Sequence, residues 1–200
     1  MTELPNNPHI TPEELRDFGQ KLIQRGIKTL RLNNILLNEY SNEQMDTLLK
    51  VIRSANIETL SLIDNQSNKK IKLAGWQHFC AGLASVSLVE LIMDNNQLHR
   101  FTAKHWQALE PIAAATSLTL LSLQNNNLVA MKKKSHQAFN TLVHKRPDGE
   151  NRCLISHNNW EMNMDRWTQL ISLNRHGLFP SISNKKDQTA GAHPQSSSPR

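Results

Sequence analysis

Apolar residues follow a short alternating pattern that is clearest between Leu118 and Leu128, where the sequence reads LTLLSLQNNNL. Counted from Leu118, leucine occupies positions one, four, six and eleven, and asparagine occupies position nine. Because side chains alternate along a strand, Leu121 and Leu123 point to the same face of a sheet. Asn126 follows where the chain leaves the strand, and its amide can bond backbone groups that a turn leaves unpaired. The stretch therefore predicts a short strand with one buried face, followed by an asparagine turn.

The same signature recurs at nearly constant spacing, which distinguishes a repeat from a chance match. Its fourth position is occupied in turn by Leu30, Leu60, Leu91, Leu121 and Cys153, at intervals of 30, 31, 30 and 32 residues. The first copy has isoleucine in place of the asparagine, and the last copy is the most divergent. Divergent copies at the two ends are expected of a stacked array.

A helical pattern with the same period lies between the strand signatures. Met45, Leu48, Leu49 and Ile52 stand at i, i+3, i+4 and i+7, which places them on one face of a helix. Later copies are Trp76, Phe79, Cys80 and Leu83, then Trp106, Leu109 and Ala113, then Phe139 and Val143, then Trp167, Leu170 and Ile171. Apolar residues in 15–22 precede the first copy by one period, so we expect an N-terminal helix that caps the array.

Helix-start signals agree with this period. Thr11 and Glu14 form a capping-box sequence around a proline, and Ser41 and Gln44 repeat it before the next helix. Pro111 lies inside a helical pattern, where we expect it to remove one backbone hydrogen bond and kink the helix.

Together these features resemble leucine-rich repeat proteins with long strand-plus-helix repeats, similar to the ribonuclease-inhibitor type, over roughly residues 10–178. The resemblance implies an α/β leucine-rich repeat solenoid, with a concave parallel sheet of about five strands and helices on the convex side. We expect a flexible lead-in at residues 1–10 and a repeat domain with an N-terminal helical cap at residues 11–180. Residues 181–200 are almost free of apolar side chains and predict a disordered polar tail.

The formal net charge of +6 comes from 23 Lys and Arg against 17 Asp and Glu. Lysine runs such as 132–134 are typical of solvated loops and helix starts, and no zinc-finger, RNA-recognition or helix-turn-helix signature accompanies them. No apolar stretch approaches the roughly 20 residues of a membrane helix, and no secretory signal peptide is visible. We expect neither a nucleic-acid nor a membrane partner. We expect a cytoplasmic protein, or one secreted into a host cell without a classical signal peptide.

Cys80 and Cys153 are the only cysteines, and both occupy predicted core positions, so free, buried thiols are expected. Pairs such as His78 with Cys80, or Cys153 with His157, would need an exposed thiolate to act as nucleophile and base. The sequence contains neither an H-E-x-x-H motif nor a paired C-x-x-C motif. We therefore expect no catalytic residue, no cofactor and no metal site.

In leucine-rich repeat proteins generally, residues flanking the strand leucines face the concave surface and most often bind the partner. Carried onto this chain, the third positions are Thr29, Thr59, Glu90, Leu120 and Arg152, the fifth are Arg31, Ser61, Ile92, Ser122 and Leu154, and the seventh are Asn33, Ile63, Asp94, Gln124 and Ser156. From these positions we expect a partner-binding set of Thr29, Arg31, Asn33, Ile63, Glu90, Ile92, Asp94, Leu120, Ser122, Gln124, Arg152 and Leu154.

Some positions of this set are apolar, although the alternation places them on the exposed face. An apolar centre with a charged edge is typical of a binding surface. Scattered exposed aliphatic residues are also normal, and a flanking segment would cover them equally well. The apolar positions are Ile63, Ile92, Leu120 and Leu154, and the charged ones are Arg31, Glu90, Asp94 and Arg152.

These observations favour a non-catalytic, monomeric scaffold for protein–protein recognition through the concave face. Small Asn-rich arrays with a polar tail resemble effectors that intracellular bacteria deliver into host cells by type IV secretion, where they act in virulence. The alternative, implied by the ribonuclease-inhibitor resemblance, is a cytoplasmic inhibitor or regulator of an enzyme. Nucleic-acid binding through the lysine runs, a third hypothesis, predicts steep salt dependence.

Overall fold

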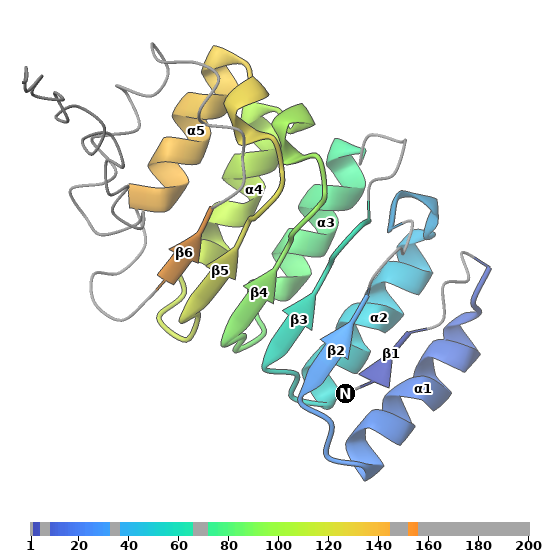
Figure 1. Cartoon of the computed structure of the whole chain (residues 1–200). Coiled ribbons are helices and arrows are strands. Elements are labelled where there is room, and N and C mark those ends of the chain that lie inside the picture. The colour runs from blue at the N-terminus through green and yellow to red at the C-terminus, as the bar shows by residue number, and fades with distance from the viewer. Residues whose placement is uncertain (1, 5–8, 33–36, 66–71, 145–151, 156–200) are drawn as a thin grey trace, which may run out of the picture.

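Strands and helices alternate along the chain in the computed structural model, which describes residues 2–4, 9–32, 37–65, 72–144 and 152–155 (Figure 1). The strands are β1 (Thr2–Glu3), β2 (Thr29–Arg31), β3 (Thr59–Ser61), β4 (Glu90–Ile92), β5 (Leu120–Ser122) and β6 (Arg152–Leu154). The α-helices are α1 (Pro12–Gln24), α2 (Asn42–Ser54), α3 (Leu73–Leu83), α4 (Ala103–Ala113) and α5 (Lys133–His144). Single 3₁₀ turns are η1 (Leu37–Glu39), η2 (Leu98–Arg100) and η3 (Leu128–Ala130).

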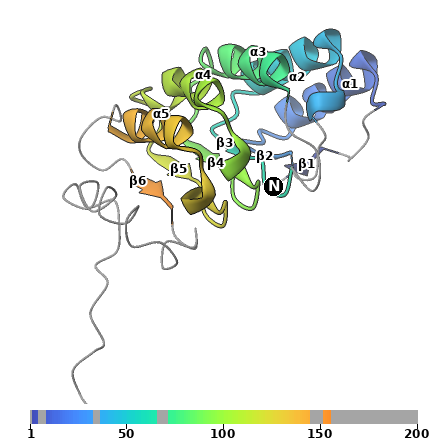
Figure 2. The ribbon, with the colours of Figure 1, turned by 90° about the horizontal axis from the view of Figure 1, so that it is seen from above.

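The strands form one parallel sheet in the order β1-β2-β3-β4-β5-β6, and the described helices all lie on one side of it (Figures 1 and 2). Leu30 stands opposite Leu60, Leu60 opposite Leu91, and Leu91 opposite Leu121, so each repeat aligns with the next. Parallel neighbours require a crossover connection, and α2, α3, α4 and α5 each provide one. The predicted α/β class, with repeating β–α units on a parallel sheet, is confirmed.

The core lies between the sheet and the helices. The middle residue of each strand from β2 to β6 is at most 3% exposed, and the predicted apolar helix faces are buried with it. Trp76, Phe101, Trp106 and Phe139 form a continuous row across α3, α4 and α5, with ring centroids 5.0–5.2 Å apart. Trp76 Nε1 also donates to the carbonyl oxygen of His105 at 2.9 Å. The aromatic row therefore joins neighbouring repeats through their helices.

The repeat asparagines form a buried ladder beyond the ends of the strands. Asn96 Oδ1 accepts from the backbone N–H of Asn65, and Asn126 Oδ1 accepts from that of Asn96, each at 2.7 Å. The amide nitrogen of Asn96 donates to the carbonyl oxygens of Leu62 and Asp94 at 2.6 and 2.9 Å. This confirms the predicted role of the asparagine at Asn96 and Asn126, and it shows that each of these two amides bonds the preceding repeat as well as its own turn.

Both predicted capping boxes are present. Glu14 Oε2 accepts from the Thr11 N–H at 2.7 Å, and Ser41 and Gln44 make the equivalent pair before α2. A third box that the sequence analysis missed precedes α4, where His105 Nδ1 accepts from the Thr102 N–H at 3.2 Å. A capping box usually has Glu or Gln at this position, so the sequence with histidine did not predict the box. Helix α4 continues past Pro111 to its end at Ala113.

The N-terminal segment differs from the expected lead-in. Thr2 pairs with Leu30, and the N–H of Leu4 donates to the carbonyl oxygen of Arg31 at 3.1 Å. Leu4 and Ile10 are 1% and 5% exposed. Residues 2–4 pair with the sheet because the edge of β2 presents unpaired backbone groups, and the core accepts the apolar side chains of Leu4 and Ile10. It contributes a strand beyond the five that the repeats predict.

Two expectations concern residues beyond the described ranges. The predicted last helix, around Trp167, and the polar tail at residues 181–200 both lie there. Within the described ranges, no helix is long and apolar enough to cross a membrane.

Candidate partner-binding face

The predicted binding residues lie in rows on the face of the sheet opposite the helices, which we call the helix-free face (Figure 2). Strand pairing sets the third and fifth repeat positions side by side across β2 to β6. The third-position row is Thr29, Thr59, Glu90, Leu120 and Arg152, and the fifth-position row is Arg31, Ser61, Ile92, Ser122 and Leu154. Arg152 and Leu154 are placed by their backbone alone, and Asn33 and Ser156 fall outside the described residues.

Exposure varies along these rows. Thr29, Arg31, Glu90, Ile92 and Leu120 are half-buried, as are the seventh-position residues Ile63, Asp94 and Gln124. Ser122, which the sequence analysis included in the binding set, is only 3% exposed, and Ser61 is buried to the same extent. A hydroxymethyl group is too short to reach past the larger side chains beside it. Ser122 is therefore poorly accessible to a partner.

Asp94 satisfies the buried hydroxyl of Ser122. Its Oδ1 accepts a hydrogen bond from Ser122 Oγ at 2.7 Å and from the backbone N–H of Gln124 at 2.8 Å. Gln124 Nε2 also donates to Ser122 Oγ at 3.2 Å. Three predicted binding residues are thus committed to one another, and this cluster links the C-terminal ends of β4 and β5. Sequence reasoning missed the cluster because its members lie in different repeats.

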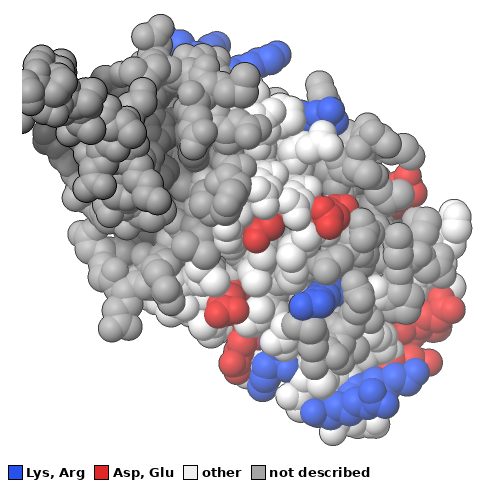
Figure 3. All heavy atoms as spheres, viewed as in Figure 1, with Lys and Arg blue, Asp and Glu red and all other residues white. Residues whose placement is uncertain are grey.

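Glu90 in β4 and Asp94, two residues beyond the end of β4, carry negative charge on the same face, where Asp94 bonds the side chain of Ser122. Glu90 Oε2 accepts from Thr59 Oγ1 at 3.1 Å. Neither carboxylate forms an ion pair with a Lys, Arg or His among the described residues. Figure 3 shows acidic side chains over the middle of the sheet. Their charge is therefore available to a partner.

Ile92 and Leu120 form the apolar part of this surface. Leu120 stands opposite Glu90, so Ile92 is its diagonal neighbour, one strand spacing of about 4.8 Å across and two residues along. Both are half-buried, and no described helix covers this face. The structure thus places an aliphatic pair between two carboxylates that have no cationic partner among the described residues.

The thiols considered as nucleophiles are inaccessible. Cys80 and Cys153 are both free and buried, as the sequence predicted. Burial raises the pKa of the Cys80 thiol well above its ordinary value, which opposes thiolate formation. His78 Nε2 instead lies 2.8 Å from Asp46 Oδ1, in a hydrogen bond between α3 and α2. His157 is outside the described residues. Within the described ranges, no cluster of three His, Cys, Asp or Glu could hold a metal ion.

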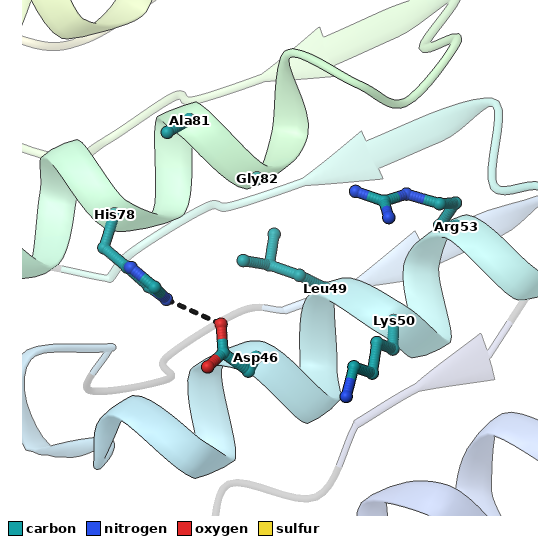
Figure 4. Close-up of a pocket in the computed structure, with 7 residues that line it drawn as sticks. All are labelled: Asp46, Leu49, Lys50, Arg53, His78, Ala81 and Gly82. Atoms are coloured by element: carbon teal, nitrogen blue, oxygen red, sulfur yellow. Dashed lines mark hydrogen bonds and ion pairs between the residues drawn. The ribbon is translucent and has the colours of Figure 1, made fainter.

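A groove on the helix side, which the sequence did not predict, runs between α2 and α3 (Figure 4). Its volume is about 210 Å³, and its floor is formed where Gly82 lies against Leu49. The His78–Asp46 hydrogen bond crosses the groove, and Arg53 donates to Ser85 nearby. The groove is shallow and its polar groups bond one another, so it offers less to a ligand than the helix-free face.

No family model, no curated protein and no solved structure matches this chain. The geometry of the chain itself is therefore the basis for a functional assignment.

Proposed function

We propose that this chain is a leucine-rich repeat solenoid that recognises a protein partner on its helix-free face and performs no catalysis. The repeat interval, the buried strand leucines and the asparagine ladder support the repeat assignment. Proteins of this architecture bury their own core between neighbouring repeats and leave one extended surface for binding.

The observation that carries the proposal is the composition of the helix-free face around β4 and β5. Half-buried Ile92 and Leu120 adjoin Glu90 and Asp94, whose carboxylates lack cationic partners among the described residues. These carboxylates lie over the middle strands, where their charge can complement that of a partner bound to the sheet (Figure 3). The surface fits a partner segment that presents Lys or Arg beside an aliphatic or aromatic side chain.

The expected energetics are modest for each residue. Complete burial of one aliphatic side chain contributes about 1.5–3 kcal/mol before the cost of association. Ile92 and Leu120 are already half-buried, so each contributes about half of that. The carboxylates mainly increase the association rate and exclude partners of the wrong charge.

Affinity capture from bacterial and host-type lysates tests the assignment. The bait is the native chain or an Ile92→Glu, Leu120→Glu variant, and a second variant, Ile23→Glu with Gln24→Glu, serves as control. The control adds the same charge on α1, where Ile23 is 43% exposed on the helix side. Circular dichroism and thermal unfolding establish that all three chains are folded.

We expect the native chain and the α1 control to retain a partner that the sheet-face variant loses. If a folded sheet-face variant retains the same partner, the helix-free face is not the binding site. Enrichment of a single enzyme whose activity falls on binding would favour the inhibitor hypothesis over a general scaffold.

The biological setting is a separate part of the proposal. Delivery into a host cell by type IV secretion is supported by the composition of residues 181–200, which lie outside the described residues. A translocation assay with a reporter fusion tests it directly. We expect removal of residues 181–200 to abolish transfer while leaving partner capture unchanged. Absence of transfer by the full chain would favour a regulator in the cytoplasm of the producing cell.

A further inference from the structure

Charge is distributed unevenly along the stack of repeats. Residues 11–64 contain seven Lys or Arg and eight Asp or Glu, whereas residues 95–144 contain five Lys or Arg and one acidic residue, Glu110. The five cations lie near one end of the helices, at the close of η2 and in the segments that start α4 and α5. This basic edge consists of Arg100, Lys104, Lys132, Lys133 and Lys134, and all five side chains are exposed. Figure 3 shows Lys and Arg gathered at the edge where α4 and α5 begin.

The basic edge has no charge compensation within the described part of the chain. None of its five side chains forms a hydrogen bond or an ion pair with another described residue. Glu110 lies in the last turn of α4, at the opposite end of that helix. Among the described residues, no anion pairs with these like charges, which lie on neighbouring helices about 8–10 Å apart and repel one another.

The helix starts sharpen this contrast. The first turns of α1 and α2 contain Glu13, Glu14 and Glu43, which suit the positive end of the helix dipole. The first turns of α4 and α5 contain no acidic residue, and Lys104, Lys133 and Lys134 stand there instead. These lysines oppose the dipole as well as one another. The lysines at the starts of α4 and α5 are thus electrostatically unfavourable, whereas acidic residues stand at the starts of α1 and α2.

We propose that the basic edge is a second interaction surface, which binds an acidic segment of a protein partner. Cations on neighbouring helices are separated by about 8–10 Å. A peptide in the polyproline II conformation covers this distance in about three residues, which also return its side chains to the same face. A segment with Asp or Glu at every third position would therefore place one carboxylate at each helix start. This surface is separate from the helix-free face and does not depend on its assignment.

Two other polyanions fit the surface less well. Binding of single-stranded nucleic acid without sequence preference relies on aromatic side chains for base stacking, and stable attachment to a membrane needs an apolar anchor besides a polybasic patch. Among the described residues, the large hydrophobic side chain with substantial exposure is Ile23, which lies on α1. The basic edge therefore offers charge and hydrogen-bond donors without an apolar or aromatic platform.

The test uses the full chain and a short fluorescein-labelled peptide with glutamate at every third position. Fluorescence anisotropy measures its affinity for the native chain and for an edge variant, Lys132→Gln, Lys133→Gln and Lys134→Gln. The matched control, Lys21→Gln, Arg25→Gln and Lys50→Gln, removes the same charge from exposed positions on α1 and α2. Thermal unfolding establishes that every variant is folded. Phosphatidylserine vesicles and duplex DNA compete with the peptide in parallel measurements.

We expect the peptide to bind the edge variant about tenfold more weakly than the native chain, and the control to change by about twofold or less. The Ile92→Glu, Leu120→Glu variant should bind the peptide as the native chain does, so failure at one surface is distinguishable from failure at the other. Equal losses in the edge variant and the control would mean that net charge alone drives binding, and would overturn the proposal. Tighter binding of vesicles or DNA through the same lysines would overturn the assignment to an acidic protein segment.

Discussion

Replacement of Asn126 by alanine tests whether the asparagine ladder holds the repeats together. Asn126 is fully buried, and its Oδ1 accepts from the Asn96 N–H at 2.7 Å. Its Nδ2 donates to the carbonyl oxygens of Met93 and Gln124 at 2.9 and 3.0 Å. Gln124 O would keep a second donor, the N–H of Asn95 at 3.1 Å. The alanine variant therefore leaves two closely bonded buried groups without their partners, the Asn96 N–H and the Met93 carbonyl, and it also removes the longer bond from the Leu98 N–H to Asn126 Oδ1 at 3.4 Å.

The size of the effect follows from those two groups. Each buried polar group left unsatisfied costs about 1–3 kcal/mol, so we expect Asn126→Ala to lower the free energy of unfolding by about 2–6 kcal/mol. The total free energy of unfolding of a domain is about 5–15 kcal/mol, so the expected loss is a large fraction of it. Asn126→Asp keeps the acceptor and the size but turns an oxygen toward Met93 O. It should be at least as destabilising as alanine.

Urea unfolding followed by tryptophan fluorescence measures both variants. The control is Asn125→Gly, since Asn125 is exposed beside the ladder and has a φ of +54°, which glycine adopts readily. We expect the control to change stability by about 0.5 kcal/mol or less. A loss below about 1 kcal/mol for Asn126→Ala, with an unchanged dependence on urea, would refute the ladder as a major stabilising element.

Three further predictions concern stability at other sites. Gly82→Ala should destabilise by about 1–3 kcal/mol, because its Cβ would overlap Leu49 Cδ1. Gly75→Ala, which has open space in the same helix, should stabilise by about 0.5–1 kcal/mol. Thermal unfolding compares the two variants, and equal effects would contradict the close packing of α2 and α3. Tyr40 is the only tyrosine. Its hydroxyl is buried and has no hydrogen-bond partner in the part of the chain that the structure describes, and burial raises its pKa from 10.0 to about 12. The contribution of Tyr40 to the free energy of unfolding is therefore fully present below pH 10. It falls by about 1–2 kcal/mol, after allowance for solvent screening, as the pH rises toward 12. Tyr40→Phe should be at least as stable as the native chain at neutral pH and should lack this loss, and a tyrosinate absorbance titration with a midpoint near 10 would contradict the burial effect. Lys133→Glu should raise stability by about 0.3–1 kcal/mol, because it reverses a charge that opposes the α5 dipole; a decrease in thermal stability would mean that Lys133 has an intramolecular role.

The helix faces show what periodicity could predict. Trp76, Phe79 and Cys80 were assigned to the core from spacing alone, and each is at most 2% exposed. That inference succeeds because a helix in a stacked array meets the same environment in every repeat, so one face repeats with the chain. The role of the asparagines was predictable for the same reason.

The candidate site was only partly predictable. Alternation correctly placed Glu90 and Ile92 on one face, but it also placed Ser122 among accessible residues, where the structure buries it beneath the Asp94 cluster. The alternating pattern predicts the face on which a side chain lies, but it does not predict which side chains surround it. The hydrogen bond between Asp46 and His78, and the groove that it crosses, likewise depend on which residues of adjacent helices meet.

The sequence by itself determined the repeat interval, the identity of the strands and helices, and the residues of the core. These follow from the spacing of residues and from the need to bury apolar side chains, and both can be read from the sequence. Only the tertiary structure decided that Thr2 adds a strand beside Leu30 and that Asp94 is committed to the next repeat. It also brought Arg100 and Lys104 together with the lysine run 132–134 into one edge. These features depend on contacts between repeats, and such contacts exist only after the chain has stacked.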